Sequence, residues 1–209
     1  SDEGHNRMVM KGGFGVGQMD EDGNVMASLA SQLRYWDLDP ADFKGKPEAT
    51  RGALQQAKRA LGPSRGYSHY DHIPDEQLTD AFHYTLFPNF AVSVWADGFH
   101  FLRARPHRSD PEQCVFDNWW YASPASVEAE QPTGTLGTGL LADVDKKWLN
   151  YPEDSIGPGI EDDVSVFVTQ QRGFRSRGFK GVYLSNQESR IRRLHGLVDD
   201  YIEGRLPAR

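Results

Sequence analysis

The 209-residue sequence contains a single cysteine, Cys114, and lacks any run of about 18 apolar residues. One cysteine excludes an internal disulfide framework, and the missing apolar run argues against a transmembrane helix. The first residues show neither a signal-peptide core nor an Arg-rich transit pattern. These absences predict a cytoplasmic protein with no membrane partner.

Acidic residues outnumber basic ones, 30 Asp and Glu against 23 Lys and Arg, so the formal net charge is −7 at pH 7. An acidic chain of this kind argues against a nucleic-acid partner. Near the C-terminus, however, positive charge is concentrated in Arg172, Arg175, Arg177, Arg190, Arg192 and Arg193. We expect most of these arginines to balance neighbouring acidic groups.

Two families of catalytic motif are missing as well. The glycine-rich stretch Gly12–Gly17 lacks the GxGxxG spacing of a phosphate-binding loop, and we interpret it as a strand end where backbones pack closely. No GxSxG nucleophile elbow occurs in the chain. A hydrolase is therefore a weak third hypothesis, after the two that are given below.

The middle of the chain is rich in strand signals. Its length suits one domain over residues 1–209. A short strand is predicted at His5–Lys11, and three blocks of strand pattern follow at Phe82–Trp95, Phe99–Pro106 and Cys114–Tyr121. Asp97-Gly98 favours a tight hairpin between the first two of these blocks. The sequence therefore predicts an antiparallel meander.

Helical patterns lie on both sides of this meander. Segments at Asn24–Trp36 and Pro47–Leu61, with a short helix after Pro74, predict a helical insertion over about residues 24–80. A loop rich in Pro, Gly and Thr covers Ser123–Gly139. The last helix starts with a capping box, Ser185 to Glu188, and carries apolar residues at helical spacing up to Gly204. Strands first and a long helix last indicate an α+β domain.

A further helix, Glu161–Gly173, carries an acidic pair near its start. One arc of its helical wheel is shared by Ile160, Val164, Phe167, Val168 and Gln171. Asp163 lies at the edge of this arc, whereas Asp162 points away from it. An inward carboxylate is unfavourable unless it is protonated, paired or bound to a cation. Asp163 is therefore a candidate metal ligand, and the alternative is an acidic turn that complements the helix dipole.

Histidines elsewhere offer weaker candidates. His69 and His72 lie three residues apart in a polar loop beside Asp71, a spacing that suits a metal, but solvated loop histidines are commoner. His83 and His100 lie on predicted strands. We expect each of them to be a neutral imidazole with one hydrogen-bonded nitrogen in a half-buried sheet.

Several blocks together resemble a known family. They are Phe82–Asn89, Phe101–Pro106, Glu161–Gly173 continued by Arg175–Phe179, and Leu184–His195. In order and spacing they resemble the catalytic domain of Rieske non-haem iron aromatic-ring-hydroxylating oxygenase α subunits. The resemblance implies a helix-grip (START/SRPBCC-like) fold, in which a curved antiparallel sheet packs around the long C-terminal helix. It also implies that Asp163, or alternatively Asp162, is a ligand to a mononuclear Fe(II).

The departures from this family concern the other ligands. The family's iron needs two histidines, normally from an Asp-x2-His-x4-His segment, and we expect these upstream of Ser1. A [2Fe–2S] Rieske cluster needs two cysteines and two histidines, so it is expected only in a missing N-terminal part. The resemblance implies electrons from NAD(P)H through a reductase, often with a ferredoxin, and a homotrimeric assembly. The chain is thus expected to be a part of a longer α subunit or a short relative, and to be inactive alone.

The substrate pocket should be apolar, as suits an aromatic molecule. Its candidate lining residues come from the meander and are Phe87, Asn89, Phe90, Val92, Val94, Phe101 and Trp119. The leading hypothesis is dioxygenase-type, O2-dependent hydroxylation of an aromatic or related hydrophobic substrate, in the catabolism of aromatic hydrocarbons. The alternative is a metal-free module of the same fold that binds hydrophobic ligands. The metal content of the purified protein separates the two.

Overall fold

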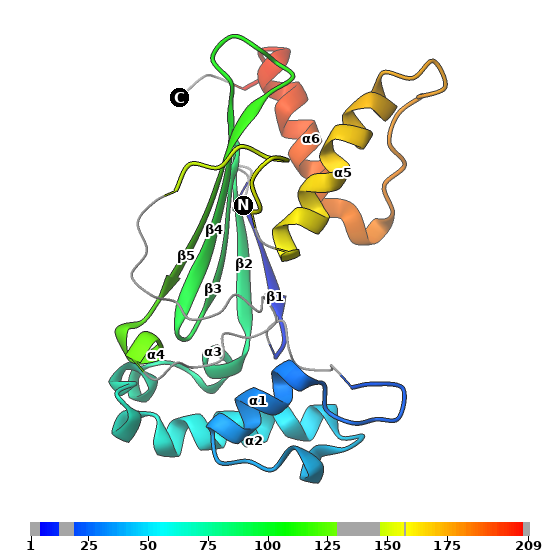
Figure 1. Ribbon diagram of the computed structural model, residues 1–209. Helices are drawn as coiled ribbons and strands as arrows, with labels where there is room; N and C mark the ends of the chain where they lie inside the picture. Colours follow the sequence, from blue (N-terminus) through cyan, green and yellow to red (C-terminus); the bar gives the residue numbers. More distant parts are fainter. Residues whose placement is uncertain (1–4, 13–18, 129–146, 157, 207–209) are drawn as a thin grey trace. The chain divides into compact units, whose positions relative to one another are not determined.

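The computed structural model describes residues 5–12, 19–128, 147–156 and 158–206 (Figure 1). The chain divides into two compact units, residues 1–142 and 143–209. The first unit contains the strands and the shorter helices, and the second contains the helices α5 and α6. The single domain expected over residues 1–209 stays a prediction.

Five strands form one antiparallel sheet in the order β1-β2-β3-β4-β5 (Figure 1). Their bounds are Asn6–Met10 (β1), Ala81–Leu86 (β2), Phe90–Trp95 (β3), Gly98–Pro106 (β4) and Cys114–Ala122 (β5). The last four strands follow one another directly, and β1 pairs with β2 across the helical insertion. The predicted N-terminal strand and antiparallel meander are confirmed, and the α+β class with them.

One block of the meander differs from the prediction. Phe82–Trp95 is not continuous, because β2 ends at Leu86 and β3 begins at Phe90, with Leu86 and Phe90 paired across the turn. Pro88 lies in this turn. Since proline lacks an N–H for a sheet ladder, it interrupts the strand pattern at this point.

The hairpin predicted at Asp97-Gly98 joins β3 to β4, with Trp95 paired to Gly98. A glycine is needed at position 98 because a Cβ atom there would lie 2.0 Å from the backbone oxygen of Tyr121 on β5. Close approach of two backbones, and not an unusual φ angle, therefore selects this residue.

Replacing Gly98 by alanine is expected to destabilise the protein by about 1–3 kcal/mol, because the sheet must open to accept the methyl group. Gly52 is a matched control, since a Cβ there meets nothing within 4 Å in the interior of a helix. Gly52→Ala is expected to stabilise the protein by about 0.5–1 kcal/mol. Thermal unfolding measures both changes, and a Gly98→Ala variant that melts at or above the parent temperature contradicts the close-approach argument.

The helical insertion begins with α1 (Ala27–Tyr35) and α2 (Pro47–Leu61), and ends with α3 (Asp75–Thr79). Short 3-10 turns lie between them at Pro40–Phe43, Pro63–Arg65 and Ser68–His72. Helix α1 starts later than predicted because Asn24 bonds to the Asp20 carboxylate in a turn outside the helix. The core of the insertion is buried and consists of Leu29, Leu33, Trp36, Leu54, Tyr67, Tyr70 and Leu78.

The tip of the β3–β4 hairpin is anchored in this insertion by Asp97. The Tyr70 hydroxyl donates to the two Asp97 carboxylate oxygens at 2.6 and 2.7 Å. The ammonium of Lys58 lies 3.4 Å from Asp97 Oδ2 and also faces the rings of Trp36 and Tyr70. Both members of this ion pair are buried. A charged cluster thus fixes the helical insertion to one end of the sheet.

A short helix, α4 (Pro124–Glu128), follows β5 within the segment that was predicted as a loop. The loop prediction over Ser123–Gly139 is therefore wrong for these five residues. Residues 129–139 lie outside the described residues. Ser123 Oγ accepts the backbone N–H of Ser126 at 3.2 Å, which starts the helix in the manner of an N-cap.

The second unit contains α5 (Pro158–Phe174) and α6 (Ser189–Ile202). The capping box predicted between Ser185 and Glu188 is present, and it precedes α6 through a 3-10 turn. Leu197 is the buried residue of α6, whereas Ile202 is 77% exposed. The packing of this last helix against the sheet stays a prediction. In the described parts of the chain, no helix has the length and apolar character that crossing a membrane requires.

Candidate functional site

The acidic residues of α5 differ in what they bind. Glu161 accepts hydrogen bonds from the hydroxyl of Ser155 at 2.6 Å and from the backbone N–H of Ile156 at 2.9 Å. These bonds tie the residues that precede α5 to its first turn. Asp162 and Asp163 are both exposed, and neither carboxylate bonds to another described residue. Asp163 therefore has its ligand oxygens available, and its preference over Asp162 as a metal ligand stays a prediction.

The predicted apolar arc of α5 is only partly covered. Val164 and Gln171 are half-buried, whereas Phe167 is 47% and Val168 is 50% exposed. Across residues 5–12, 19–128, 147–156 and 158–206, no three His, Cys, Asp or Glu side chains gather closely enough to hold a metal ion. At Asp163 the described residues therefore supply one carboxylate as a possible iron ligand. One carboxylate does not by itself form a facial triad, which also needs two histidines.

Five of the predicted pocket residues share one face of the sheet. The strand register places Phe90, Val92 and Val94 of β3 on the same side as Phe101 of β4 and Trp119 of β5. Phe101 packs against Phe90 with ring centroids 4.4 Å apart and stacks on Trp119 at 5.0 Å. We call this side the aromatic face. Its other members include Phe82, Tyr84, Phe99 and Tyr121.

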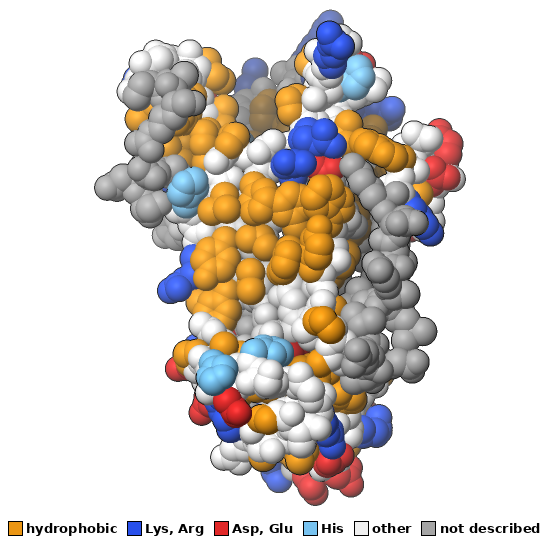
Figure 2. All heavy atoms as spheres, turned by 90° about the vertical axis from the view of Figure 1, so that its left-hand side faces the viewer, with side chains coloured by type: hydrophobic (Ala, Val, Ile, Leu, Met, Phe, Trp, Pro, Cys, Tyr) orange, Lys and Arg blue, Asp and Glu red, His pale blue; other side chains and the backbone are white. Residues whose placement is uncertain are grey.

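Figure 2 shows a broad apolar surface over the sheet, with basic and acidic side chains around it. Several residues of the aromatic face have large exposed fractions, and they are Val94 (37%), Phe99 (37%) and Tyr121 (47%). An apolar surface of this breadth marks a site of binding or packing. It agrees in character with the apolar pocket predicted from the sequence, whose lining residues remain predictions.

Phe87 and Asn89, the other predicted pocket residues, lie in the turn between β2 and β3. The Asn89 side-chain amide donates to the backbone oxygen of Ala104 at 2.6 Å, which ties the turn to β4. The backbone N–H of Phe87 bonds to the ring of His5 at 3.3 Å. The structure thus gives Asn89 a structural contact, and a role in substrate binding stays a prediction.

A charged cluster at one end of the aromatic face was not predicted from the sequence. Asp117 of β5 is buried and accepts hydrogen bonds from Arg105 at 2.9 and 3.0 Å and from Arg103 at 2.8 Å. The hydrogen bonds from Arg105, supported by Arg103 and opposed by burial, hold the pKa of Asp117 below its ordinary value. The cluster therefore keeps its charge at neutral pH. The sequence did carry one signal for this cluster, because Arg103 and Arg105 are two residues apart on a strand and therefore lie on the same face.

The opposite face of the sheet carries a row of polar side chains. His83 bonds through Nδ1 to Ser93 at 2.8 Å, and His100 bonds through Nε2 to Asn118 at 2.6 Å. His100 is buried and stacks on Trp120 with centroids 3.7 Å apart. Burial lowers the pKa of His100, so its imidazole is neutral near pH 7. The expectation of hydrogen-bonded sheet histidines is confirmed for both residues.

The loop histidines are placed differently from each other. The Nε2 atom of His69 lies 2.9 Å from the backbone oxygen of Ala96 and 3.6 Å from Asp97 Oδ1. The nearby Asp97 carboxylate is the main cause that raises the pKa of His69. His72 is exposed. His69 therefore belongs to the cluster that anchors the hairpin.

Comparison with protein families gives one match. The family described as ring hydroxylating alpha subunit (catalytic domain) has a model that matches residues 13–204. Comparisons with curated proteins and with solved structures found no match. The family match extends across both compact units and confirms the resemblance that the sequence blocks predicted.

Proposed function

Because the chain belongs to the family of ring-hydroxylating α-subunit catalytic domains, we propose that it forms the catalytic-domain portion of an aromatic-ring-hydroxylating oxygenase. The family is of the oxygenase type, and the match over residues 13–204 is the observation that carries the proposal. The reaction proposed is the O2-dependent hydroxylation of an aromatic or related hydrophobic substrate. The five-stranded antiparallel sheet followed by a C-terminal helix agrees with the helix-grip fold of such a domain.

The proposed metal is a mononuclear Fe(II), which would supply the activation of dioxygen. In this proposal Asp163 contributes one ligand, and the two histidine ligands come from outside residues 1–209. This ligand assignment is based on the side chains present. The described residues offer the carboxylate of Asp163, but no three ligating side chains gather among them. A carboxylate and two histidines form the open facial triad of non-haem iron oxygenases.

The aromatic face suits the substrate proposed here. Flat rings pack well on edge-to-face and stacked aromatic side chains, which Phe90, Phe101 and Trp119 supply. Burial of apolar surface provides the affinity, while polar groups near the edge fix orientation. The cluster at one end, in which Arg103 and Arg105 share the carboxylate of Asp117, limits the extent of the apolar surface.

Electrons are proposed to come from NAD(P)H through a reductase or ferredoxin, by way of a Rieske [2Fe–2S] centre outside this chain. The sequence contains one cysteine, and Cys114 is exposed, so a centre that needs two cysteines lies elsewhere. We also propose that the complete α subunit assembles as a trimer, as α subunits of the family do.

The metal content of the purified chain tests this assignment. We expect the 209-residue chain alone to retain far less than one iron per molecule after anaerobic loading with Fe(II) and desalting, and to show no ring hydroxylation. One carboxylate with waters binds Fe(II) too weakly to survive desalting. Near-stoichiometric iron that is lost on substitution of His69, His72 or His83 contradicts the proposed ligand set.

The second candidate function is a metal-free module that binds hydrophobic ligands. The breadth of the exposed aromatic face favours it (Figure 2). Because Trp119 stacks on Phe101, an aromatic ligand on this face is expected to change tryptophan fluorescence in the presence of a chelator. Binding unaffected by the chelator, together with no activity in an α subunit that carries the histidines, would favour this candidate over the oxygenase.

A further inference from the structure

The aromatic face of the sheet carries more positive than negative charge, although the whole chain carries −7. Along the five strands, the register places three basic residues and one acidic residue on this face. They are Arg7 of β1, Arg103 and Arg105 of β4, and Asp117 of β5. Three positive charges and one negative charge give this face a net charge of +2.

The carboxylate of Asp117 is shared by two arginines and can neutralise only one of them. Arg105 donates to its two oxygens, from Nε to Oδ2 at 2.9 Å and from Nη2 to Oδ1 at 3.0 Å. Arg103 donates from Nε to the same Oδ2 at 2.8 Å, and its Nη2 also lies 2.8 Å from that oxygen. The Nη1 atom of Arg103 donates to no residue that the structure describes. The cluster therefore has a net charge of +1 and a donor to spare.

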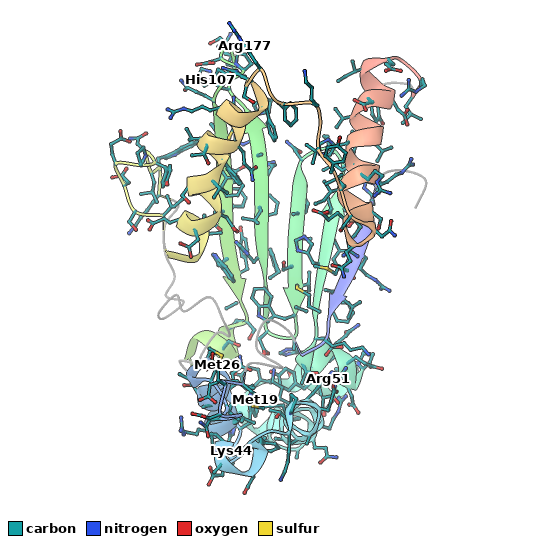
Figure 3. The ribbon with its side chains drawn as sticks, turned by 90° about the vertical axis from the view of Figure 1, so that its right-hand side faces the viewer. Met19, Met26, Lys44, Arg51, His107 and Arg177 are labelled. Carbon is teal, nitrogen blue, oxygen red and sulfur yellow. The ribbon has the colours of Figure 1, made fainter. Side chains whose placement is uncertain are left out.

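The buried acids at the other end of the sheet are too far away to cancel this charge. Asp97 precedes Arg103 by six residues along β4, which is about 20 Å at about 3.3 Å per residue. Figure 3 shows His107, which follows β4, at the opposite end of the sheet from Arg51, the partner of Asp80. Charges in water are largely screened beyond about 10 Å at 0.1 M salt.

Arg103 connects this positive charge to the rings of the aromatic face. Its guanidinium carbon lies 5.6 Å from the ring centroid of Phe101 and 6.0 Å from that of Trp119. The side chain of Arg103 is 36% exposed, and Trp119 is half-buried. Residues two apart on a strand are separated by about 6.6 Å, so Arg105 lies one step farther from the rings. A ligand ring on Trp119 thus brings a directly attached acidic group within reach of Arg103.

We propose that Arg103 selects aromatic ligands that carry a carboxylate, so that the substrate of this chain is an aromatic acid and not a neutral hydrocarbon. The inference rests on the proposed function, in which the aromatic face is the surface that binds the substrate. A guanidinium and a carboxylate form short, charge-assisted hydrogen bonds in one plane. The net charge of +1 matches a monoanion. A phosphate ester, with −1.5 to −2 near neutral pH, is matched less well.

Equilibrium dialysis of the 209-residue chain against two probes, naphthoate and naphthamide, tests the proposal in the presence of a chelator. The two probes share their rings and differ in charge. We expect the parent chain to bind naphthoate at least about tenfold more tightly than naphthamide, because hydrogen bonds to charged groups are the stronger ones. Arg103→Gln is expected to lower the affinity for naphthoate about tenfold and to leave the affinity for naphthamide within about twofold.

Arg7→Gln is the matched control, because it removes the same charge from the same face at an exposed position. Strands β2 and β3 lie between β1 and β4, so Arg7 is about 14 Å away from the row of Arg103. We expect Arg7→Gln to keep the preference for naphthoate, and circular dichroism checks that both variants are folded. If Arg7→Gln loses as much of the preference as Arg103→Gln, the general field of the face and not a contact selects the anion, and the proposal is overturned.

Two further outcomes also count against the proposal. Naphthyl phosphate that binds more tightly than naphthoate overturns the assignment of a carboxylate. Equal binding of naphthoate and naphthamide overturns the role of Arg103 and leaves the oxygenase assignment intact, because no iron is present in these measurements. Failure of both probes to bind overturns the role of the aromatic face as well, whereas the oxygenase assignment is decided separately by iron content and product formation.

Discussion

Replacing Asp163 by alanine is expected to abolish iron retention and product formation in an α subunit that carries the two histidine ligands. The substitution removes the carboxylate that the proposed site depends on, and two neutral imidazoles alone bind Fe(II) weakly. Folding should be unaffected, since Asp163 is exposed and bonds to no described residue. Iron analysis after desalting and product formation with an aromatic substrate measure the two effects.

Asp162→Ala is the matched control, because Asp162 is the exposed neighbour on the same helix. We expect it to retain iron and activity and to change stability by no more than a helix-dipole contribution of about 0.3–1 kcal/mol. If the two variants exchange phenotypes, the ligand is Asp162 and the helical wheel is rotated. Full iron content and activity in both variants would assign the carboxylate to another segment.

Local signals explain why some elements were predicted correctly from the sequence. Helix α2 begins and ends as expected because Pro47 suits the first helical position and Gly62 with Pro63 cannot continue the helix. The capping box before α6 is equally local, since Ser185 and Glu188 contact each other directly. The break between β2 and β3 was missed although Pro88 marked it. There the apolar pattern on both sides outweighed a single turn residue.

The charged cluster around Asp97 could not be predicted from a sequence pattern, because its members are far apart in the chain. Lys58 and Tyr70 reach Asp97 across 39 and 27 residues, and no periodicity relates them. The same limit applies to the candidate site. A helical wheel places Asp163 nearer the apolar arc than Asp162, but both carboxylates are exposed on α5. The wheel cannot predict this, because the burial of a helix face depends on what packs against it.

Replacing Asp97 by alanine is expected to destabilise the protein by about 3–5 kcal/mol, a large part of the stability of an ordinary domain. The substitution leaves the buried ammonium of Lys58 without its counter-ion and the buried hydroxyl of Tyr70 without its acceptor. Removing both charges with Asp97→Asn and Lys58→Met should recover much of the loss, because no buried charge then remains unpaired. Urea unfolding of the single and double variants measures this coupling.

The same ion cluster sets a pH dependence. Burial raises the pKa of Asp97, but the charge of Lys58, the nearby His69 and the hydrogen bonds from Tyr70 outweigh it and hold that pKa below its ordinary value. The stabilisation from Asp97 is therefore complete above about pH 4, the unfolded value, and is lost as pH falls through the lower folded pKa. His69 has a raised pKa because the Asp97 carboxylate lies close to it. Its contribution is complete below about pH 6.5 and is lost as pH rises through the folded pKa.

The stability difference between the parent chain and Asp97→Asn should therefore be largest between about pH 4 and pH 6.5. It should shrink at lower pH, where the parent carboxylate becomes protonated, and decrease by a smaller amount above the folded pKa of His69. His69→Gln is expected to remove the decrease on the alkaline side and to leave the acid side unchanged, because the glutamine does not titrate. A difference that stays constant from pH 3 to pH 8 would mean that folding does not shift the pKa of Asp97, and a difference that falls as pH rises above about 4 would mean that Asp97 is protonated in the folded protein.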